Sequence, residues 1–290
     1  MRHLPPRPAR ARRPGRAPSF HTGDVQAMLD IKTVGLLLRE NSQDIPLARM
    51  EALFARLGVQ MHVLNHHKPN EKLDLLIAMG GDGTVLKALD LQPDCPVLAI
   101  NYGTVGFLTA GDRTDLERLL VRLLANDYIL SERLLLHCTF PWGTAHAVNE
   151  VLVRSFVRMI SVEVYVNEAK IRTIRGDGVI VGTPTGSTGF LLSTGAPLVM
   201  PGVDCLILDG LLEYNFTSRA LILAPDSRIR LHVPSLPPEQ RATVVVDGNE
   251  LGQLGEGEEI IITRSERRAQ LIFFEENYFF RNLASRLSWL

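Results

Sequence analysis

The sequence predicts an N-terminal doubly wound α/β domain followed by a C-terminal antiparallel β-sandwich domain. Two observations lead to this prediction. Between about residues 31 and 125, apolar runs of strand length alternate with segments of helical spacing, and after about residue 130 short β-rich runs follow one another. Repeated βα units form a parallel sheet, whereas successive short strands form a sandwich. With 290 residues, the chain is long enough for a core in each domain.

The α/β domain is assigned to residues 28–130. Apolar runs bounded by turn residues predict strands, and apolar residues at helical spacing predict helices. The predicted strands are Thr33–Leu38, Val59–Leu64, Leu75–Met79 and Pro96–Ile100, and the predicted helices are Ile45–Leu57, Val85–Leu89 and Thr114–Ala125. In the last of these helices, Thr114 and Glu117 have the spacing of a capping box.

The β-sandwich domain is assigned to residues 131–276. Its predicted strands lie at Ile160–Val166, Val179–Val181, Cys205–Leu208, Ala220–Leu223, Ile229–Val233, Thr243–Val246 and Ile260–Thr263. Residues 277–290 return to helical spacing, with Phe280, Leu283 and Leu287 on one face and Trp289 near the end. A lone amphipathic helix must bury its apolar face, so we expect it to pack back on the first domain.

Residues 1–27 belong to a different compositional class, because arginines and prolines dominate the first twenty positions and acidic residues are absent from them. Such a segment is expected to be disordered. It is a basic arm for nucleic acid, an organelle presequence, or an idle tail upstream of a true start at Met28. The prolines disfavour the amphipathic helix of a presequence, and we favour the tail or start-site interpretation.

Global composition gives few hints of a partner. Lys plus Arg number 31 and Asp plus Glu 32, so the net charge of −1 predicts neither nucleic acid nor an acidic membrane as a partner. No apolar run approaches the roughly 20 residues that span a bilayer. The cysteines, Cys95, Cys138 and Cys205, form neither a CxxC pair nor a metal-ligand spacing, which favours a reducing, cytoplasmic setting.

The most informative short motif is Gly-Gly-Asp-Gly-Thr at residues 80–84, directly after a buried strand. Glycines there bring bare backbone N–H groups close to an anion, and the next helix adds the positive end of its dipole. A carboxylate repels phosphate, so Asp82 needs a separate reason to be in such a loop. Asp82 either acts as a general base on a hydroxyl that attacks the phosphate, or folds an Asx-turn between glycines.

Three further stretches contain residues that could bind a ligand. Residues 101–109 place glycines beside Phe107, whose ring either lines an adenine pocket or belongs to the core. Asn149 and Glu150 interrupt an apolar strand, and they either satisfy local backbone groups or face a ligand with several hydroxyls. Residues 176–197 hold a dense set of Gly, Ser and Thr around Pro184, which favours a site for ribose or diphosphate over a flexible linker.

Together these stretches resemble the NAD kinase family. Residues 80–84 match its GGDG signature, residues 101–109 resemble its N-x-G-x-x-G-F-L segment, and Asn149-Glu150 match its NE pair. Residues 176–197 resemble its stretch containing GDG and TPTGST, residues 246–248 are similar to a later D-G element, and residues 280–289 look like its closing helix. The resemblance runs from about residue 31 to the end, whereas GGDG alone is shared with lipid kinases and sugar-phosphate kinases.

The resemblance implies ATP-dependent phosphorylation of the adenosine 2′-hydroxyl of NAD, giving NADP, in a cleft between the two domains. It implies Asp82 as the catalytic base and Gly80, Gly81, Gly83 and Thr84 as contacts to the ATP phosphates. Mg²⁺ carried by ATP is the implied cation, with no protein residue assigned as a metal ligand. The implied NAD-binding residues are Phe107, Asn149, Glu150, Asp177, Thr185, Ser187, Thr188, Gly189, Phe190, Ser193 and Asp247. The family also implies a homodimer or homotetramer, with NAD and ATP as partners and neither nucleic acid nor membrane.

The chain departs from the family pattern in three places. Gly189-Phe190 stand where Ala-Tyr is usual, so a phenol hydroxyl is missing, and the loss of one hydrogen bond costs about 0.5 to 1.5 kcal/mol of binding. Thr194 and Ala196 replace Ala and Gly, and residues 213–216, Glu-Tyr-Asn-Phe, replace a Pro-His element. These changes concern acceptor preference and efficiency.

Two other functions remain open from the sequence. A diacylglycerol- or sphingosine-type lipid kinase shares GGDG, but needs a greasy acceptor groove and gives no reason for the NE pair or TPTGST. A non-catalytic dinucleotide-binding regulator would keep the pocket, although retention of Asp82 disfavours it. The sequence leaves open whether ATP or polyphosphate is the donor and whether NADH is also an acceptor.

Overall fold

The computed structural model describes residues 24–25, 28–39, 45–64, 72–103, 106–215, 219–237 and 239–288. Most of the basic segment predicted to be disordered lies outside these ranges, as does Trp289. Asp24–Val25 form a short strand, β1, that pairs antiparallel with Leu130 and Ser131. In the described part of the chain, no helix is long and apolar enough to cross a membrane.

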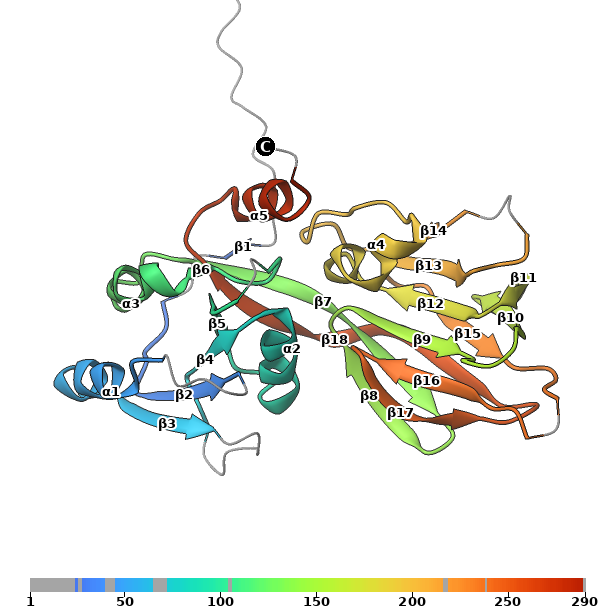
Figure 1. Ribbon diagram of the computed structural model, residues 1–290, viewed down its shortest axis with the longest axis horizontal. Helices are drawn as coiled ribbons and strands as arrows, with labels where there is room; N and C mark the ends of the chain where they lie inside the picture. The colour runs from blue at the N-terminus through green and yellow to red at the C-terminus, as the bar shows by residue number, and fades with distance from the viewer. Residues whose placement is uncertain are drawn as a thin grey trace, which may run out of the picture.

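The first domain is built on a parallel sheet, as predicted. Its strand order is β3-β2-β4-β5, and all three pairings are parallel. The strands are β2 (Thr33–Leu38), β3 (Gln60–Leu64), β4 (Leu75–Gly80) and β5 (Val97–Asn101), with a two-residue strand β6 (Gly111–Asp112) beside β5. Helices α1 (Leu47–Arg56), α2 (Asp82–Leu91) and α3 (Leu116–Leu124) cover it, and α2 lies on the side nearest the second domain (Figure 1).

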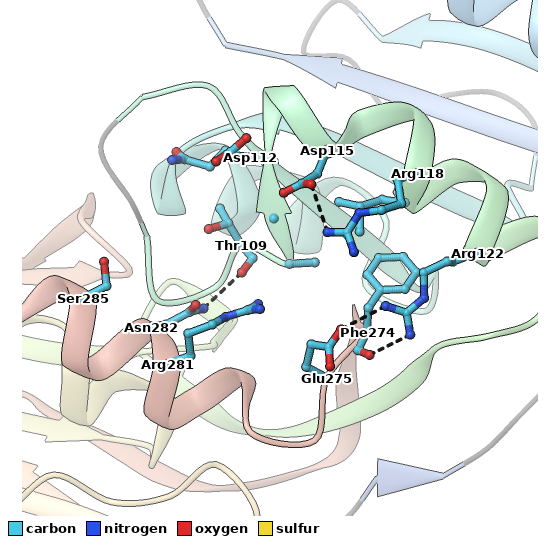
Figure 2. A pocket seen from close by; sticks show the side chains of 14 residues that line it. Thr109, Asp112, Asp115, Arg118, Arg122, Phe274, Glu275, Arg281, Asn282 and Ser285 are labelled. Atoms are coloured by element: carbon cyan, nitrogen blue, oxygen red, sulfur yellow. Dashed lines mark hydrogen bonds and ion pairs between the residues drawn. The ribbon is translucent and has the colours of Figure 1, made fainter. Parts of the chain in front are cut away.

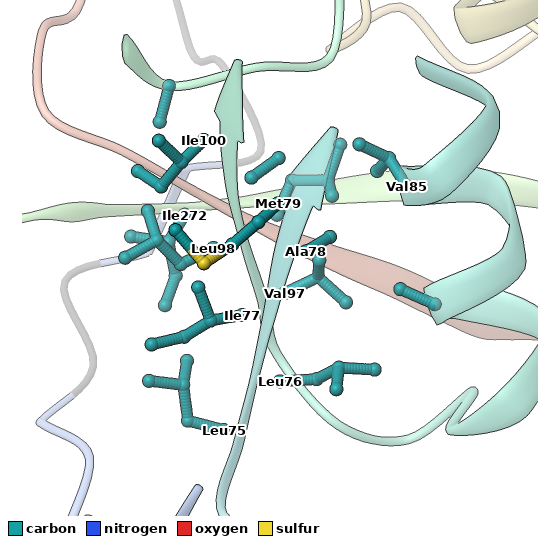
Figure 3. Packing of buried hydrophobic residues seen from close by; sticks show 14 of the residues in the cluster. Leu75, Leu76, Ile77, Ala78, Met79, Val85, Val97, Leu98, Ile100 and Ile272 are labelled. Atoms are coloured by element: carbon teal, nitrogen blue, oxygen red, sulfur yellow. The ribbon is translucent and has the colours of Figure 1, made fainter. Parts of the chain in front are cut away.

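Complete burial explains the apolar runs in this sheet. All six residues of β4 and all five of β5 are buried, so neither strand alternates polar with apolar residues. Figure 3 shows Ile77 and Met79 on one side of β4, with Ile272 from the far end of the chain, and Leu76 and Val85 on the other side. The carboxyl end of β4, where the glycine motif begins, is therefore fixed by a core on both faces.

Two long strands run through both domains. The strand β7 (Ile129–Phe140) pairs antiparallel with β18 (Glu259–Phe273), and β18 also pairs parallel with β5 through Leu271 and Ile272. The sheet of the first domain thus continues into the second as one sheet of twelve strands. The predicted boundary at residues 130 and 131 falls inside β7, so hydrogen-bonded strands and not a linker connect the domains.

The second domain is an antiparallel sandwich, which confirms the predicted class. One layer is the six-stranded sheet, in the order β14-β13-β12-β9-β16-β17. The other is the antiparallel half of the large sheet, in which β11, β10, β15 and β18 are neighbours and β7 and β8 pair beside β18. The strands are β8 (Gly143–Ala147), β9 (Glu150–Arg154), β10 (Ile160–Val166), β11 (Ala169–Gly176), β12 (Gly178–Gly182), β13 (Leu206–Leu211), β14 (Leu221–Leu223), β15 (Ile229–His232), β16 (Ala242–Val246) and β17 (Asn249–Leu254).

Two local predictions are wrong, and one helix is longer than predicted. Helix α2 contains the predicted Val85–Leu89 but begins at Asp82, directly after Gly81. The predicted capping box is absent: Asp112 caps a 3₁₀ turn, η1 (Arg113–Asp115), by accepting the Thr114 N–H at 2.8 Å, and α3 follows at Leu116. Asn149 and Glu150 do not interrupt one strand, since β8 ends at Ala147 in one sheet and β9 begins at Glu150 in the other.

The C-terminal helix α5 (Tyr278–Arg286) packs back on the first domain, as predicted. Its buried residues are Tyr278, Asn282 and Leu283, whereas Phe280 of the predicted apolar face is exposed. Tyr278 belongs to the same buried cluster as Leu98 and Ile100 of β5. Its ring stacks on Phe273 with 3.6 Å between ring centroids. The C-terminal helix therefore packs against the hydrophobic core of the first domain, from which the glycine motif extends.

Candidate active site

The Asp82 carboxylate is held by a neighbouring loop and not by its own. Its Oδ2 accepts the Phe107 N–H and its Oδ1 accepts the Leu108 N–H, each at 3.0 Å. Gly106 makes this approach possible, since a Cβ there would lie 2.2 Å from Asp82 Oδ1. The Thr84 N–H donates to the Gly81 carbonyl at 2.9 Å, so the hydrogen bond of an Asx-turn does not form.

The glycines of the motif have two different uses. Gly80 is needed for packing, because a Cβ would lie 2.1 Å from Thr84 Oγ1. At Gly81 and Gly83, by contrast, a Cβ would meet no heavy atom of the described residues within 4 Å. Their backbone therefore faces open space at the N-terminus of α2, where the helix dipole and N–H groups favour an anion.

Asp247 holds the NE pair through the backbone. Its carboxylate accepts the N–H groups of Val148, Asn149 and Glu150 at 2.7, 2.8 and 3.1 Å. Burial raises the Asp247 pKa although these three hydrogen bonds favour the charged form. Asp247 therefore fixes the crossing from β8 to β9, a role that its D-G motif did not reveal.

The hydroxyls of the TPTGST stretch mainly fold a 3₁₀ turn, η2 (Thr185–Thr188). Thr183 Oγ1 donates to the Val148 carbonyl at 2.5 Å and accepts the Gly186 N–H at 3.1 Å. Ser187 Oγ donates to the Pro184 carbonyl at 2.7 Å, and Thr188 Oγ1 donates to the Thr185 carbonyl at 3.0 Å. These hydroxyls pack the turn against the NE pair.

Close contact between this turn and the NE pair also depends on glycine. A Cβ at Gly186 would lie 2.1 Å from the Asn149 carbonyl oxygen. At Gly189, where the family usually has Ala, a Cβ would lie 3.2 Å from Glu150 Oε2. This departure from the family pattern therefore leaves additional space beside the Glu150 carboxyl. A short helix, α4 (Phe190–Thr194), follows the turn.

Glu150 is a buried carboxyl with an altered protonation state. It is 6% exposed, and burial, reinforced by the charge of Asp247, raises its pKa to about 8, although the Phe190 N–H hydrogen bond opposes the rise. Its Oε2 makes no hydrogen bond to any residue that the structure describes. At neutral pH the free protein thus holds a largely protonated carboxyl that can donate a hydrogen bond.

Two cavities divide the remaining site residues. A cleft of about 690 Å³ between α2 and the second domain is lined by residues from both domains, among them Gly83, Lys87, Val148, Asp247 and Arg267. A cavity of about 610 Å³ beside α4 is lined by residues of the second domain, among them Arg154, Asp177, Phe190, Ser193 and Arg219. The structure therefore brings the GGDG loop to Asp247, but places Asp177, Phe190 and Ser193 in a separate cavity.

Several charged residues at these cavities were missed by the sequence interpretation. The Arg154 guanidinium carbon lies 4.4 Å from the Phe156 ring centroid and 6.0 Å from that of Phe190. Lys87 and Arg267 add positive charge to the cleft between the domains. An arginine at the end of an apolar strand and a lysine in a helix give no pattern that separates them from ordinary surface residues.

Comparison with known proteins gives the family. A family model described as the ATP-NAD kinase N-terminal domain matches residues 38–128, and one described as the ATP-NAD kinase C-terminal domain matches residues 148–274. The chain belongs to the NAD kinase family. The resemblance seen in the sequence is thereby confirmed, and the lipid kinase alternative is not favoured.

Individual relatives agree with this assignment. The chain is 33% identical over 229 residues to an NAD kinase of Clostridium perfringens, covering 76% of this chain and 82% of the relative. An NAD kinase from Archaeoglobus fulgidus in complex with ATP superposes with a TM-score of 0.73 at 28% identity, covering 87% of this chain and 99% of that one. Yeast NADH kinase complexed with NADH shares the fold, with a TM-score of 0.80 at 20% identity and coverage of 89% and 88%.

Proposed function

We propose that this NAD kinase family member transfers the terminal phosphoryl group of ATP to the adenosine 2′-hydroxyl of NAD, with Asp82 as the general base. The observation that carries the proposal is the pair of hydrogen bonds from Phe107 and Leu108 to the Asp82 carboxylate. They fix the plane of the carboxylate, while each oxygen keeps a second lone pair for a substrate hydroxyl. A base fixed in this way contributes roughly 10²- to 10⁴-fold to the rate.

The phosphates are proposed to bind at the open faces of Gly81 and Gly83, with Gly80 and Thr84 completing the loop. The N-terminus of α2 faces the same space, so its dipole stabilises negative charge on the transferred group. Mg²⁺ enters with ATP as part of the substrate. The described residues contain no cluster of three or more His, Cys, Asp or Glu side chains, and a cation held by ATP phosphates does not require one.

The acceptor is proposed to bind across residues from both domains. Residues 28–130 with the helix in 277–290 form the phosphate-binding unit, and residues 131–276 form the dinucleotide-binding unit. Phe107, whose N–H binds the Asp82 carboxylate, is proposed to contact the acceptor together with Asn149 and Glu150. Asp177, Phe190 and Ser193 are proposed to form a second subsite. Thr185, Ser187, Thr188, Gly189 and Asp247 support the acceptor by shaping the turn and the NE crossing. NAD with ATP is the substrate pair that we propose, ahead of NADH or polyphosphate.

An Asp82→Asn variant tests the base assignment. It keeps the size of the side chain, and we expect it to bind NAD but to lose turnover by roughly a hundredfold or more, the low end of what a general base supplies. NADP formation from NAD, ATP and Mg²⁺ is measured against wild type and against Glu51→Gln, which removes an exposed carboxylate of α1. Near-normal turnover in Asp82→Asn contradicts the assignment. NAD binding without NADP formation in the wild-type protein favours the regulator alternative.

We also propose that the chain forms a homo-oligomer through one end of the six-stranded sheet. Arg154 and Leu211 both pair with Gly178, so the segments that follow β9 and β13 leave the sheet at the same end. These segments expose Val157 (85%), Leu212 (81%) and other large apolar side chains, and a second copy of this chain would cover them. Light scattering should give a dimer or larger, and Val157→Asp should shift it toward monomer.

A cytoplasmic location is proposed as well. All three cysteines are buried free thiols. Such thiols agree with a reducing compartment, where structural disulfides are rare.

A further inference from the structure

The loop that holds Asp82 is itself held from behind by the C-terminal helix. The Asn282 side chain of α5 donates from Nδ2 to the Phe107 carbonyl at 3.3 Å and to the Thr109 carbonyl at 3.1 Å. Figure 2 shows the contact with Thr109. Asn282 is 6% exposed, so little water competes for these carbonyls. The loop therefore lies between a carboxylate on one side and an amide on the other.

One peptide group joins these two contacts. The Phe107 carbonyl and the Leu108 N–H belong to the same planar peptide unit, which rotates as a rigid body. Asn282 fixes its oxygen end at 3.3 Å, and Asp82 Oδ1 fixes its N–H end at 3.0 Å. Hydrogen bonds in such a chain polarise one another, so the donor on α5 strengthens the hydrogen bond at the carboxylate.

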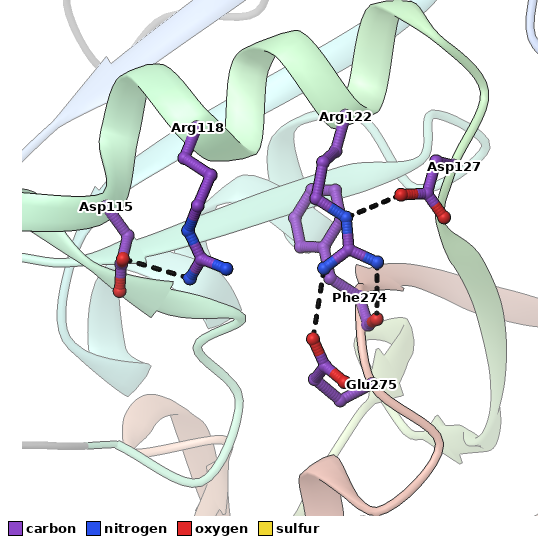
Figure 4. A network of polar contacts seen from close by, with 6 residues as sticks. All are labelled: Asp115, Arg118, Arg122, Asp127, Phe274 and Glu275. Carbon is purple, nitrogen blue, oxygen red and sulfur yellow. Dashed lines mark hydrogen bonds and ion pairs between the residues drawn. The ribbon is translucent and has the colours of Figure 1, made fainter.

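The position of Asn282 is fixed by anchors near the start of the helix. Tyr278 Oη hydrogen-bonds Ser131 Oγ at 2.8 Å and accepts from Arg133 Nη2 at 3.1 Å. Just before the helix, Arg122 binds the Glu275 carboxylate and the Phe274 carbonyl, each at 3.0 Å (Figure 4). These hydrogen bonds fix the start of α5, so the Asn282 side chain holds the two loop carbonyls in a fixed position.

We propose that Asn282 is a positioning residue for Asp82, acting through the peptide group between Phe107 and Leu108. The inference rests on the proposed role of Asp82 as the base. Removing the two hydrogen bonds of Asn282 frees the peptide group to rotate, which loosens the carboxylate. Among the residues proposed to bind NAD, Asn282 hydrogen-bonds only Phe107, and there only the backbone carbonyl. A misplacement of about 1 Å in a catalytic group costs up to roughly a hundredfold in rate.

Asn282 lines a cavity, so the fold should tolerate its substitution. A cavity of about 260 Å³ lies behind the loop between α3 and α5, and its lining includes Asn101, Arg118, Arg281 and Ser285 as well as Asn282 (Figure 2). Once the amide is gone, water from this cavity can hydrogen-bond the two carbonyls without holding the peptide group in one orientation. An apolar replacement of similar size, Asn282→Leu, should therefore fold, and Asn282→Ser is the second variant if it does not.

The test measures NADP formation by the full chain with NAD, ATP and Mg²⁺. We expect Asn282→Leu to lower kcat roughly 10- to 100-fold with KM for NAD within about twofold of wild type. Ser285→Ala, which changes an exposed residue at the same cavity, is the matched control and should leave both constants unchanged. Faster hydrogen exchange at the Leu108 amide in Asn282→Leu should accompany the loss.

A double variant distinguishes a positioning role of Asn282 from a general structural one. In an Asp82→Asn background, measured at high enzyme concentration, Asn282→Leu should cause no further loss, because the residue through which it acts is already neutralised. An unchanged kcat in the single Asn282→Leu variant overturns the proposal, and so does a loss that multiplies in the double variant. Near-normal turnover of Asp82→Asn alone instead refutes the proposed base, which is a different outcome.

Discussion

Replacing Glu150 with glutamine should make the free protein more stable at high pH and leave it almost unchanged at low pH. The carboxyl is buried beside Gly189, and its Oε2 has no hydrogen-bond partner in the described part of the chain. Burial is the main reason that its pKa is raised from 4.5 to about 8, with the charge of Asp247 as a second cause. Glutamine has nearly the same shape but never becomes charged.

The sign of the pH effect on stability follows from the direction in which the Glu150 pKa is shifted. Between pH 4.5 and about 8, the folded state keeps a proton on Glu150 that the unfolded state has released, so stability falls as the pH rises through this window. A difference of about 3.5 between the two pKa values, at about 1.4 kcal/mol each, corresponds to at most about 5 kcal/mol. Because charging occurs in full only above pH 8, the loss at pH 8 is about 4 kcal/mol.

Thermal unfolding without ligands measures this difference. At about 2 to 3 °C per kcal/mol, Glu150→Gln should unfold roughly 10 °C above wild type at pH 8 and only about 2 °C above it at pH 5. Glu256→Gln, at an exposed position in the turn before β18, is the control and should follow wild type at both values. A gap independent of pH, or a wild type more stable than Glu150→Gln at pH 8, would refute the reasoning.

Three other substitutions test separate contacts. Gly106→Ala places a Cβ 2.2 Å from Asp82 Oδ1, so turnover should fall at least about tenfold in initial-rate assays, and an unchanged rate would contradict the loop contact. Phe190→Tyr restores the hydroxyl of the family pattern and should lower KM for NAD roughly 2- to 10-fold, the equivalent of about 0.5 to 1.5 kcal/mol; an unchanged KM would mean that the hydroxyl finds no partner. Tyr278→Phe removes a hydroxyl shared by two buried side chains and should cost about 1 to 3 kcal/mol, seen as a lower Tm, whereas Tyr214→Phe at an exposed site should not.

The sequence predicts best those strands whose burial is uniform. Strand β2 has the predicted bounds, Thr33 to Leu38, because a parallel strand covered on both faces is apolar throughout. Strand β18 was predicted only at Ile260–Thr263, although it continues to Phe273. Its middle carries the polar run Arg264 to Gln270, where the pairing with β7 shifts register, so the pattern of a single strand is broken.

Charged edge strands lack the apolar pattern that identifies buried strands. Strand β11 carries Lys170, Arg172 and Arg175, and it lies at the edge of the large sheet. Charges protect an exposed edge from pairing with other chains, and they also remove the hydrophobic signal by which strands are predicted. The β-propensity of its residues therefore could not predict this edge strand.

The candidate site shows a similar division. The sequence singles out the polar motifs, but it cannot tell a hydroxyl that binds a ligand from one that folds a turn, and Thr183 and Ser187 prove to be of the second kind. Asn282 lies in the stretch that resembles the closing helix of the family, but nothing in the sequence indicates its contacts, because the carbonyls it binds belong to residues 175 and 173 positions earlier. Such contacts depend on tertiary packing, which no local pattern encodes.

The continuity of β7 and β18 also determines how this molecule can move. Many kinases admit and release nucleotides by swinging rigid bodies about a hinge. Here Leu130 pairs with Ile272 at one end and Thr139 with Ile261 at the other, so a comparable swing would bend or tear a hydrogen-bonded ladder that spans both domains. We therefore expect nucleotide exchange to depend on local side-chain and loop rearrangements, and the amides of these two strands to be among the slowest to exchange with solvent.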